Sequence, residues 1–292
     1  MSRVALVTDT THYAPRELLR ANDIHEVSLY VNLGDHHQRE SDMPDFDAFY
    51  QRLRELDQLP TTSQPSIGDF LEVYEPLAAD GRDIVSVHIA GGISGTPETA
   101  RQAGVEIEAK YPGRRVVVID SHTACGGIAL CALAGAAAVR AGGDVDAVAA
   151  AVTDATGQMK IWFAVDTLEF LRRGGRIGTA QAWLGGALKI KPILTIDHEI
   201  TPVERVRTAG RAFERLVDYL KARKEDGADG WVVQHIQARA EAEKLAERGR
   251  EVFGCEPVFI GEIGPVIGTH VGPGLLGAGG IPRRMLDGLA LD

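Results

Sequence analysis

Short apolar runs alternate with amphipathic segments along the first half of the chain, and this alternation restricts the fold more than any other feature. The amphipathic segments repeat apolar residues at spacings of three and four, which is typical of helices that bury one face. Parallel strands need long crossover connections, so strands separated by helices predict a mainly parallel α/β sheet. We predict strands over Val4–Val7, Val27–Val31, Ile84–Ile89 and Val116–Ile119. We predict helices over Phe46–Leu56, Ile67–Ala79, Thr99–Lys110 and Cys125–Arg140.

The pattern changes after a further predicted helix at Asp144–Gln158. Asp197-His198-Glu199 lies between two β-rich runs and predicts a turn between antiparallel strands. A chain of 292 residues has the usual length of two domains. We predict an N-terminal α/β domain over residues 1–157, which carries the Thr62 and Ser94 loops, and a C-terminal α/β domain over residues 158–292. The other strands expected in the second domain are Ile161–Val165, Ile190–Ile196, Trp231–Ile236 and Val258–Ile260.

Two polar loops precede helices in the N-terminal half. Ala90–Thr96 combines glycines with hydroxyls and joins a predicted strand to a predicted helix. Pro60–Ser66 is rich in hydroxyl side chains, and Ser66 followed by Asp69 fits a capping box at the start of the next helix. The first N–H groups of a helix have no partner within it, and such ends attract carboxylate or phosphate. We therefore expect the two loops to converge on the anionic head of a ligand.

The charge of the chain argues against several classes of partner. Lys and Arg number 31 against 41 Asp and Glu, and the formal net charge of −10 repels nucleic acids and anionic lipid surfaces. The three cysteines fit neither a disulfide framework nor a zinc pattern, and the histidines show no metal-ligand spacing, so we expect buried thiols and no metal. The N-terminus has no signal-peptide core, and the longest apolar window, Cys125–Val139, is too short to cross a bilayer. We expect a cytoplasmic protein without stable membrane insertion.

Seven short segments in a fixed order carry more information than any one of them alone. They are Val7–Thr11, Thr62–Ser66, Gly92–Thr96, Val118–Ser121, Leu168–Ile177, Leu188–Leu194 and Ile267–Gly274. In this order they resemble the DegV family, the fatty-acid-binding proteins that present a fatty acid to a separate fatty acid kinase. The chain departs from the family pattern at Pro97 and at Leu275–Pro282, which replaces the usual apolar-aromatic end.

The resemblance implies a two-domain DegV-like fold, with an N-terminal mainly parallel three-layer α/β/α domain, a C-terminal α/β domain and the ligand at their interface. It implies a long-chain fatty acid in a buried tunnel, which the kinase phosphorylates so that the acyl phosphate enters phospholipid metabolism. The protein is then a lipid-binding carrier with no cofactor, not an enzyme. At the carboxylate the resemblance places Thr62, Ser94, His270 and Arg207. It assigns loop support to Ser63, Gly95, Thr96 and Gly92, and contact with the kinase or phosphate to Arg172, Arg173 and Arg176.

Each of these roles has a structural alternative. Hydroxyls are favoured in turns and at helix N-caps whether or not a ligand binds, and a short basic run is commonly a solvated turn. Asp9 and Asp120, at strand ends, are expected to cap loops, because a carboxylate would repel a bound fatty acid. The alternative function is an enzyme acting on a small phosphorylated or carboxylated metabolite, with Asp9, Asp120 and His270 as acid-base groups. The sequence has no P-loop and no dinucleotide fingerprint in a strand-helix setting.

Overall fold

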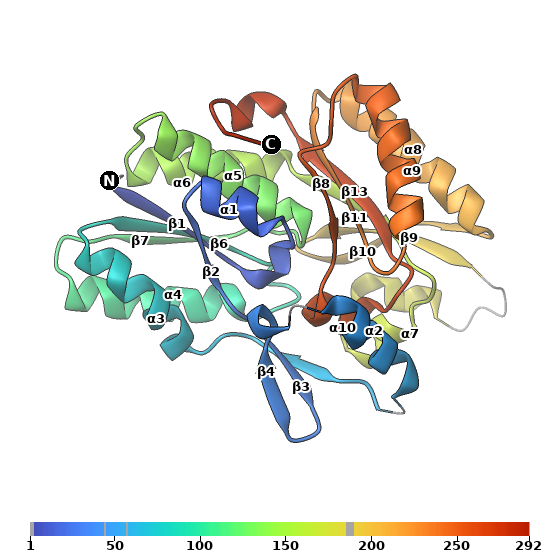
Figure 1. The fold of residues 1–292 in the computed structure, drawn as a ribbon, viewed down its shortest axis with the longest axis horizontal. Coiled ribbons are helices and arrows are strands. Elements are labelled where there is room, and N and C mark those ends of the chain that lie inside the picture. The colour runs from blue at the N-terminus through green and yellow to red at the C-terminus, as the bar shows by residue number, and fades with distance from the viewer. Residues whose placement is uncertain (1–2, 44, 57, 185–189, 292) are drawn as a thin grey trace.

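A four-stranded parallel sheet in the order β2-β1-β6-β7 forms the centre of the N-terminal half of the computed structural model (Figure 1). Helices cover both of its faces, which explains why β1 and β6 are buried along almost their whole length. The predicted mainly parallel sheet is confirmed. Its strands are β1 (Val4–Asp9), β2 (Ile24–Val27), β6 (Asp83–His88) and β7 (Val116–Asp120).

The structure describes residues 3–43, 45–56, 58–184 and 190–291. Leu188 and Lys189, which belong to the sixth segment of the family resemblance, lie outside these ranges. In the ranges that are described, no helix combines the length and the apolar character needed to span a membrane.

Two pairs of helices enclose the parallel sheet. α3 (Ile67–Ala79) and α4 (Thr96–Lys110) pack on one face, and α5 (Gly126–Arg140) and α6 (Val145–Gln158) pack on the other. The predicted capping box starts α3, because Ser66 Oγ accepts from Asp69 N while the Asp69 side chain accepts from Ser66 N. α4 begins three residues before its predicted start. Pro97 lies in its first turn, where proline needs no hydrogen-bond donor.

A six-stranded sheet in the order β10-β9-β8-β13-β11-β12 forms the C-terminal half, and its pairs are antiparallel except for β11 with β12. α8 (Ala209–Glu225) and α9 (Arg239–Phe253) cover its outer face. α5 packs against β1 and β6 on one side and against β13 and β11 on the other, so one buried helix joins the two sheets. The strands are β8 (Lys160–Ala164), β9 (Lys191–Asp197), β10 (Glu199–Val206), β11 (Gly230–His235), β12 (Phe259–Glu262) and β13 (Leu276–Ile281).

A small antiparallel sheet, in the order β4-β3-β5, projects at the bottom of the view in Figure 1. It shows that the single strand predicted over Val27–Val31 is wrong. The chain leaves the parallel sheet after Val27 and begins an antiparallel hairpin at Tyr30, and apolar composition alone does not mark this change of partner. The strands are β3 (Tyr30–Leu33), β4 (His36–Arg39) and β5 (Thr61–Ser63).

The remaining elements are a hairpin turn and short helices. The turn predicted at Asp197-His198-Glu199 is confirmed, because β9 and β10 pair directly on either side of His198. The boundary predicted between residues 157 and 158 lies at the end of α6, directly before β8, and it stays a prediction.

Short helices complete the fold: α1 (Arg16–Ala21), α2 (Phe46–Glu55), α7 (Glu169–Arg173), α10 (Pro265–Val271) and the 3-10 turns at Thr10–His12, Glu40–Asp42, Gly178–Trp183 and Arg283–Leu286.

Candidate functional site

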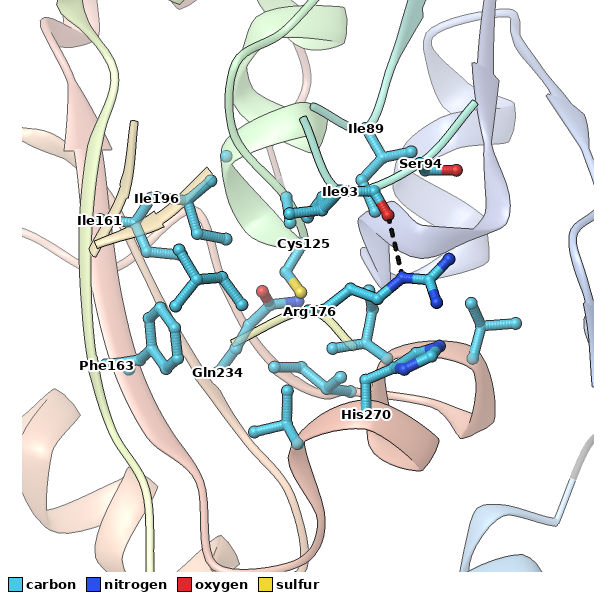
Figure 2. Close-up of a pocket in the computed structure, with 18 of the residues that line it drawn as sticks. Ile89, Ile93, Ser94, Cys125, Ile161, Phe163, Arg176, Ile196, Gln234 and His270 are labelled. Atoms are coloured by element: carbon cyan, nitrogen blue, oxygen red, sulfur yellow. Dashed lines mark hydrogen bonds between the residues drawn. The ribbon is translucent and has the colours of Figure 1, made fainter. Parts of the chain in front are cut away.

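A cavity of about 320 Å³ lies between the carboxyl end of the parallel sheet and the inner face of the six-stranded sheet. This volume is within the range of about 300 to 1,000 Å³ that is typical of small-molecule sites. Most lining side chains are aliphatic or aromatic, and Figure 2 shows Ile161, Phe163 and Ile196 at one end and Ser94, Arg176 and His270 at the other. The cavity therefore has an apolar body and one polar end.

A second cavity, of about 820 Å³, is larger but chemically different. Charged side chains line it, among them Arg16, Arg20, Glu26, Glu40 and Glu262. We take the smaller cavity as the candidate site, because it alone of the two combines an apolar interior with the loops that the sequence singles out.

Thr62 and His270 form the first contact at the polar end. Thr62 lies in β5, paired with Val31 of β3, and His270 lies in α10 from the opposite end of the chain. The distance between Thr62 Oγ1 and His270 Nε2 is 2.6 Å, a short hydrogen bond. The glycine-rich segment around His270 is thus helical, and the helix turns the imidazole toward a strand of the other half.

Ser94 lies in the loop between β6 and α4, as the sequence predicts. Its Oγ is 2.8 Å from Thr96 Oγ1 and accepts a hydrogen bond from Thr96 N at 3.3 Å. Gln64 joins this loop to the Thr62 strand, because its Nε2 donates to Thr99 Oγ1 at 2.7 Å and its amide packs where a side chain on Gly95 would lie. A side chain on Gly95 would therefore displace the Gln64 amide from this contact.

Arg176 crosses the polar end from the turn after α7. Its Nε donates to the Ile93 carbonyl at 3.4 Å, drawn as a dashed line in Figure 2, and its Nη1 donates to the Gly174 carbonyl at 2.8 Å. The side chain is exposed, so the polar end opens to solvent. Among the described residues that line the cavity, Arg176 is the one with a permanent charge, and none carries a carboxylate.

His270 is neutral at neutral pH in this environment. Burial, and to a smaller extent the nearby Arg176 guanidinium, together lower the pKa of His270 to about 4. Its Nδ1 lies against Gly174 and has no hydrogen-bond partner among the described residues. The ring therefore acts as a neutral hydrogen-bonding group with one nitrogen on Thr62.

The apolar end depends on β13, which sequence reasoning missed. Leu276 and Ala278 pack in the core beneath α8 and α9, and the alternating residues Gly277 and Gly279 present no side chains to the cavity, which Ala278 also lines. A strand with this many glycines has weak β-propensity, and it lies in the segment that departs from the family pattern. The signal that was available is the alternation of glycine with a larger apolar residue.

The predicted site residues separate into three groups. Thr62, Ser63, Ser94, Gly95, Arg176 and His270 line the cavity. Thr96 and Gly92 do not line it but hold the Ser94 loop, Thr96 through Ser94 and Gly92 by packing against the His198 carbonyl. Arg172, Arg173 and Arg207 lie outside the lining: Arg172 pairs with Glu169 at 2.6 Å on α7, and Arg207 is exposed after β10. The structure thus does not bring Arg207 to the polar end.

The acid-base set of the alternative enzyme hypothesis does not assemble. Asp9 and Asp120 are not among the cavity-lining residues, while His270 is. Asp9 accepts from the backbone of Thr11 and Ile89, and Asp120 accepts from the backbone of Gly91 and His122. Both carboxylates therefore cap loops, as expected.

Asp9 also completes a sealed Ser-His-Asp arrangement. His88 Nε2 is 2.6 Å from Ser86 Oγ, and His88 Nδ1 is 3.0 Å from Asp9 Oδ2. All three side chains are fully buried, and the Tyr74 hydroxyl donates a hydrogen bond to Ser86 Oγ at 2.7 Å. Burial acts to raise the pKa of Asp9, but the hydrogen bonds from His88, Thr11 and Ile89 outweigh it and hold this pKa below its ordinary value. No substrate reaches this serine, so the arrangement is a structural network.

Comparisons with known proteins agree with this geometry. The model of the DegV family of uncharacterised proteins matches residues 3–283. A DegV domain-containing protein of Streptomyces coelicolor is 40% identical over 281 residues, which cover 95% of this chain and 98% of the relative.

Two solved structures are similar throughout. A fatty-acid-binding DegV family protein from Thermus thermophilus has a TM-score of 0.85 and 32% identity, and the match covers 96% of this chain and 99% of that one. DegV from Bacillus subtilis, a fatty acid binding protein, has a TM-score of 0.85 and 32% identity, with 96% and 100% covered. These matches confirm the predicted fold class.

Proposed function

Because the chain belongs to the DegV family, we propose that its cavity binds a long-chain fatty acid and presents the carboxylate to a separate fatty acid kinase. The observation that carries the proposal is the lining itself: an apolar body ends in two hydroxyls, an imidazole and an arginine, without a carboxylate among the described lining residues. An acyl chain gains about 0.8 kcal/mol for each buried CH₂ group. A buried carboxylate in turn needs several donors, because an unpaired charge in an apolar cavity is costly.

Thr62 and His270 together supply one hydrogen-bond donor to the carboxylate, the Thr62 hydroxyl. If Nδ1 carried the imidazole proton, a buried N–H would lie against Gly174 without a partner among the described residues, which costs free energy. The proton therefore belongs on Nε2, where it is donated to Thr62 Oγ1 across the 2.6 Å contact. The hydroxyl proton of Thr62 is then free to be donated to the carboxylate.

Ser94 and Arg176 complete the proposed head-group site. Ser94 stands at the N-terminal end of α4, where the helix dipole favours an anion. The Arg176 guanidinium supplies positive charge at the open end of the cavity, where its exposure reduces the cost of desolvation. Ser63 and Gly95 shape the same end, and Thr96 and Gly92 hold the loop from behind.

The position of the polar end supports presentation of the carboxylate to a kinase. The carboxylate in this proposal sits beside an exposed arginine, so a second protein can reach it without opening the apolar body. Arg172 and Arg173, on the exposed side of α7, are proposed to contact the kinase or the transferred phosphate. The protein itself needs no cofactor in this role. Carrier and kinase must share a compartment, which the sequence predicts to be the cytoplasm.

Lipid analysis tests the proposal directly. We expect organic extraction and mass spectrometry of the purified protein to recover fatty acid at a molar ratio near one, and the delipidated protein to bind added palmitate or oleate. Recovery of no fatty acid together with no binding of either acid would refute the proposal. A kinase pulled down from a lysate by the loaded protein, and not by the delipidated one, would support presentation.

A further inference from the structure

A second cluster of ligand-type side chains lies beside the Ser94 loop but outside the cavity. Asp120 ends β7, His122 follows two residues later, and His198 is the turn residue between β9 and β10. Asp120 Oδ2 is 3.8 Å from His122 Nε2 and 3.8 Å from His198 Nδ1. The ligand atoms of all three side chains lie within 4.8 Å of one another. The fold thus gathers two imidazoles and a carboxylate from segments that are far apart in the sequence.

We propose that Asp120, His122 and His198 bind a divalent transition-metal cation of the Zn²⁺ type. Two imidazole nitrogens and a carboxylate oxygen form a three-residue donor set that suits Zn²⁺ and leaves a fourth position for water. Ligand atoms about 2.1 Å from a tetrahedral ion lie about 3.4 Å apart. The observed separations of 3.8 Å therefore need only small rotations of the side chains. Mg²⁺ and Ca²⁺ are disfavoured, because they prefer oxygen ligands.

The carboxylate is already fixed in place. Asp120 Oδ1 accepts from His122 N at 2.9 Å, and Gly91 N donates to both carboxylate oxygens at 3.1 and 3.0 Å. The Asp120 side chain is only 14% exposed, whereas the two histidine side chains are 56% and 58% exposed. The cluster therefore combines one anchored ligand with two that solvent, and an ion from solvent, can reach.

The backbone directs both histidines toward the carboxylate. His122 and His198 have φ values of 54° and 66°, in the left-handed region that residues other than glycine rarely adopt. His198 N donates to the His122 carbonyl at 3.1 Å, and the two rings meet edge to face with centroids 5.1 Å apart. An ion at this site would join the β9–β10 turn to the loops after β6 and β7. The sequence expectation of no metal rested on spacing alone, which could not show that His198 approaches Asp120.

Zinc titration of the full chain tests the assignment. We expect the chelator-treated protein to bind one Zn²⁺ in isothermal titration calorimetry and to unfold at a higher temperature when Zn²⁺ is present. His122→Asn and His198→Asn should each weaken Zn²⁺ binding at least tenfold. Asparagine is chosen because it tolerates the left-handed backbone of both positions. His36→Asn, an exposed histidine of β4, is the matched control and should leave Zn²⁺ affinity unchanged.

Two outcomes would overturn the assignment. One is a wild-type protein that shows neither binding heat nor a thermal shift at millimolar Zn²⁺. The other is a His122→Asn/His198→Asn double variant that binds Zn²⁺ as tightly as the wild type. NMR of the wild-type histidine rings gives a check that needs no folded variant: Zn²⁺ should move the His122 and His198 signals first, and movement of other histidines alone would contradict the site. Because the probe is the metal alone, the result is independent of the fatty-acid proposal.

Discussion

Thr62 Oγ1 lies 2.6 Å from His270 Nε2, so a strand of the N-terminal half and a helix of the C-terminal half share one hydrogen bond at the polar end of the cavity. The two residues are 208 positions apart. Neither half alone can form the proposed head-group site.

Thr62→Val removes the hydroxyl and keeps the shape of the side chain. We expect it to weaken fatty acid binding by about 1 to 3 kcal/mol, because a carboxylate loses a donor and His270 loses its partner. Fluorescent fatty acid displacement measures the change. Thr61→Val, in the same strand but exposed, is the control and should bind like the wild type. Equal affinity in Thr62→Val would remove Thr62 from the head-group site.

Arg176→Gln should raise the pKa of His270. Burial is the larger cause of the low pKa of about 4, and it remains in the variant. The variant loses the positive charge of Arg176, which is the second cause of the low pKa. An NMR titration of the His270 ring in ligand-free protein checks this. Arg172→Gln removes an equivalent charge outside the cavity lining and should leave the titration unchanged. An identical His270 titration in Arg176→Gln would show that the two groups do not interact.

Glu40→Gln should change how stability depends on pH. Burial raises the pKa of Glu40 to about 7, although Tyr13 and Val266 each donate to its Oε1 at 2.7 Å. A raised pKa in the folded state means that the stability contributed by protonated Glu40 is present below about pH 4.5 and is lost as the pH rises through 7. Urea unfolding at pH 5 and pH 8 should therefore show the variant gaining stability relative to the wild type at the higher pH. A difference that stays constant would contradict the assignment.

Ile161→Phe should shorten the space available to an acyl tail. Ile161 lines the apolar end of the cavity, and the added ring volume extends into it. We expect stearate affinity to fall more than laurate affinity, because the longer tail loses buried methylenes worth about 0.8 kcal/mol each. Trp162→Phe alters the opposite face of β8, where Trp162 stacks on Tyr219, and should leave the ratio of the two affinities unchanged. Equal losses for both acids in Ile161→Phe would place the tail elsewhere.

The elements of the parallel sheet were predictable because each one carries its own local signal. β1, β6 and β7 are apolar runs, and the start of α3 is marked by Ser66 and Asp69. The polar loops followed from the same topology, since the carboxyl ends of parallel strands meet at one edge. Ser94, which follows β6, lines the cavity for this reason. Thr62 also lines the cavity, but it lies in β5 of the small antiparallel sheet and not in the loop that the sequence predicted.

The predictions that were wrong or missing concern elements whose partners are distant in the sequence. β3 pairs with β5, which follows α2 in the sequence. The residues of β2 and β3 themselves therefore do not show where one strand ends and the next begins. β13 has little β-propensity of its own because of its glycines, and its neighbours β8 and β11 supply the apolar surroundings that hold it in the sheet. Likewise, the approach of His198 to Asp120 depends on how two sheets pack, which spacing along the chain does not record.

The position of α5 limits how a fatty acid could enter and leave the cavity in the proposed function. The helix is buried from Gly126 to Ala136 and packs against both sheets, so a hinge motion that parted the halves would expose the side of α5 that packs on β11 and β13 to water. Loading and unloading are therefore expected to proceed by threading the hydrocarbon lengthwise past Arg176, with rearrangement confined to the rim. The acyl tail of the bound fatty acid would then stay out of water while the protein docks on its partner. The rate of fatty acid exchange would depend on the stiffness of the Ser94 and Arg176 loops and not on separation of the two halves.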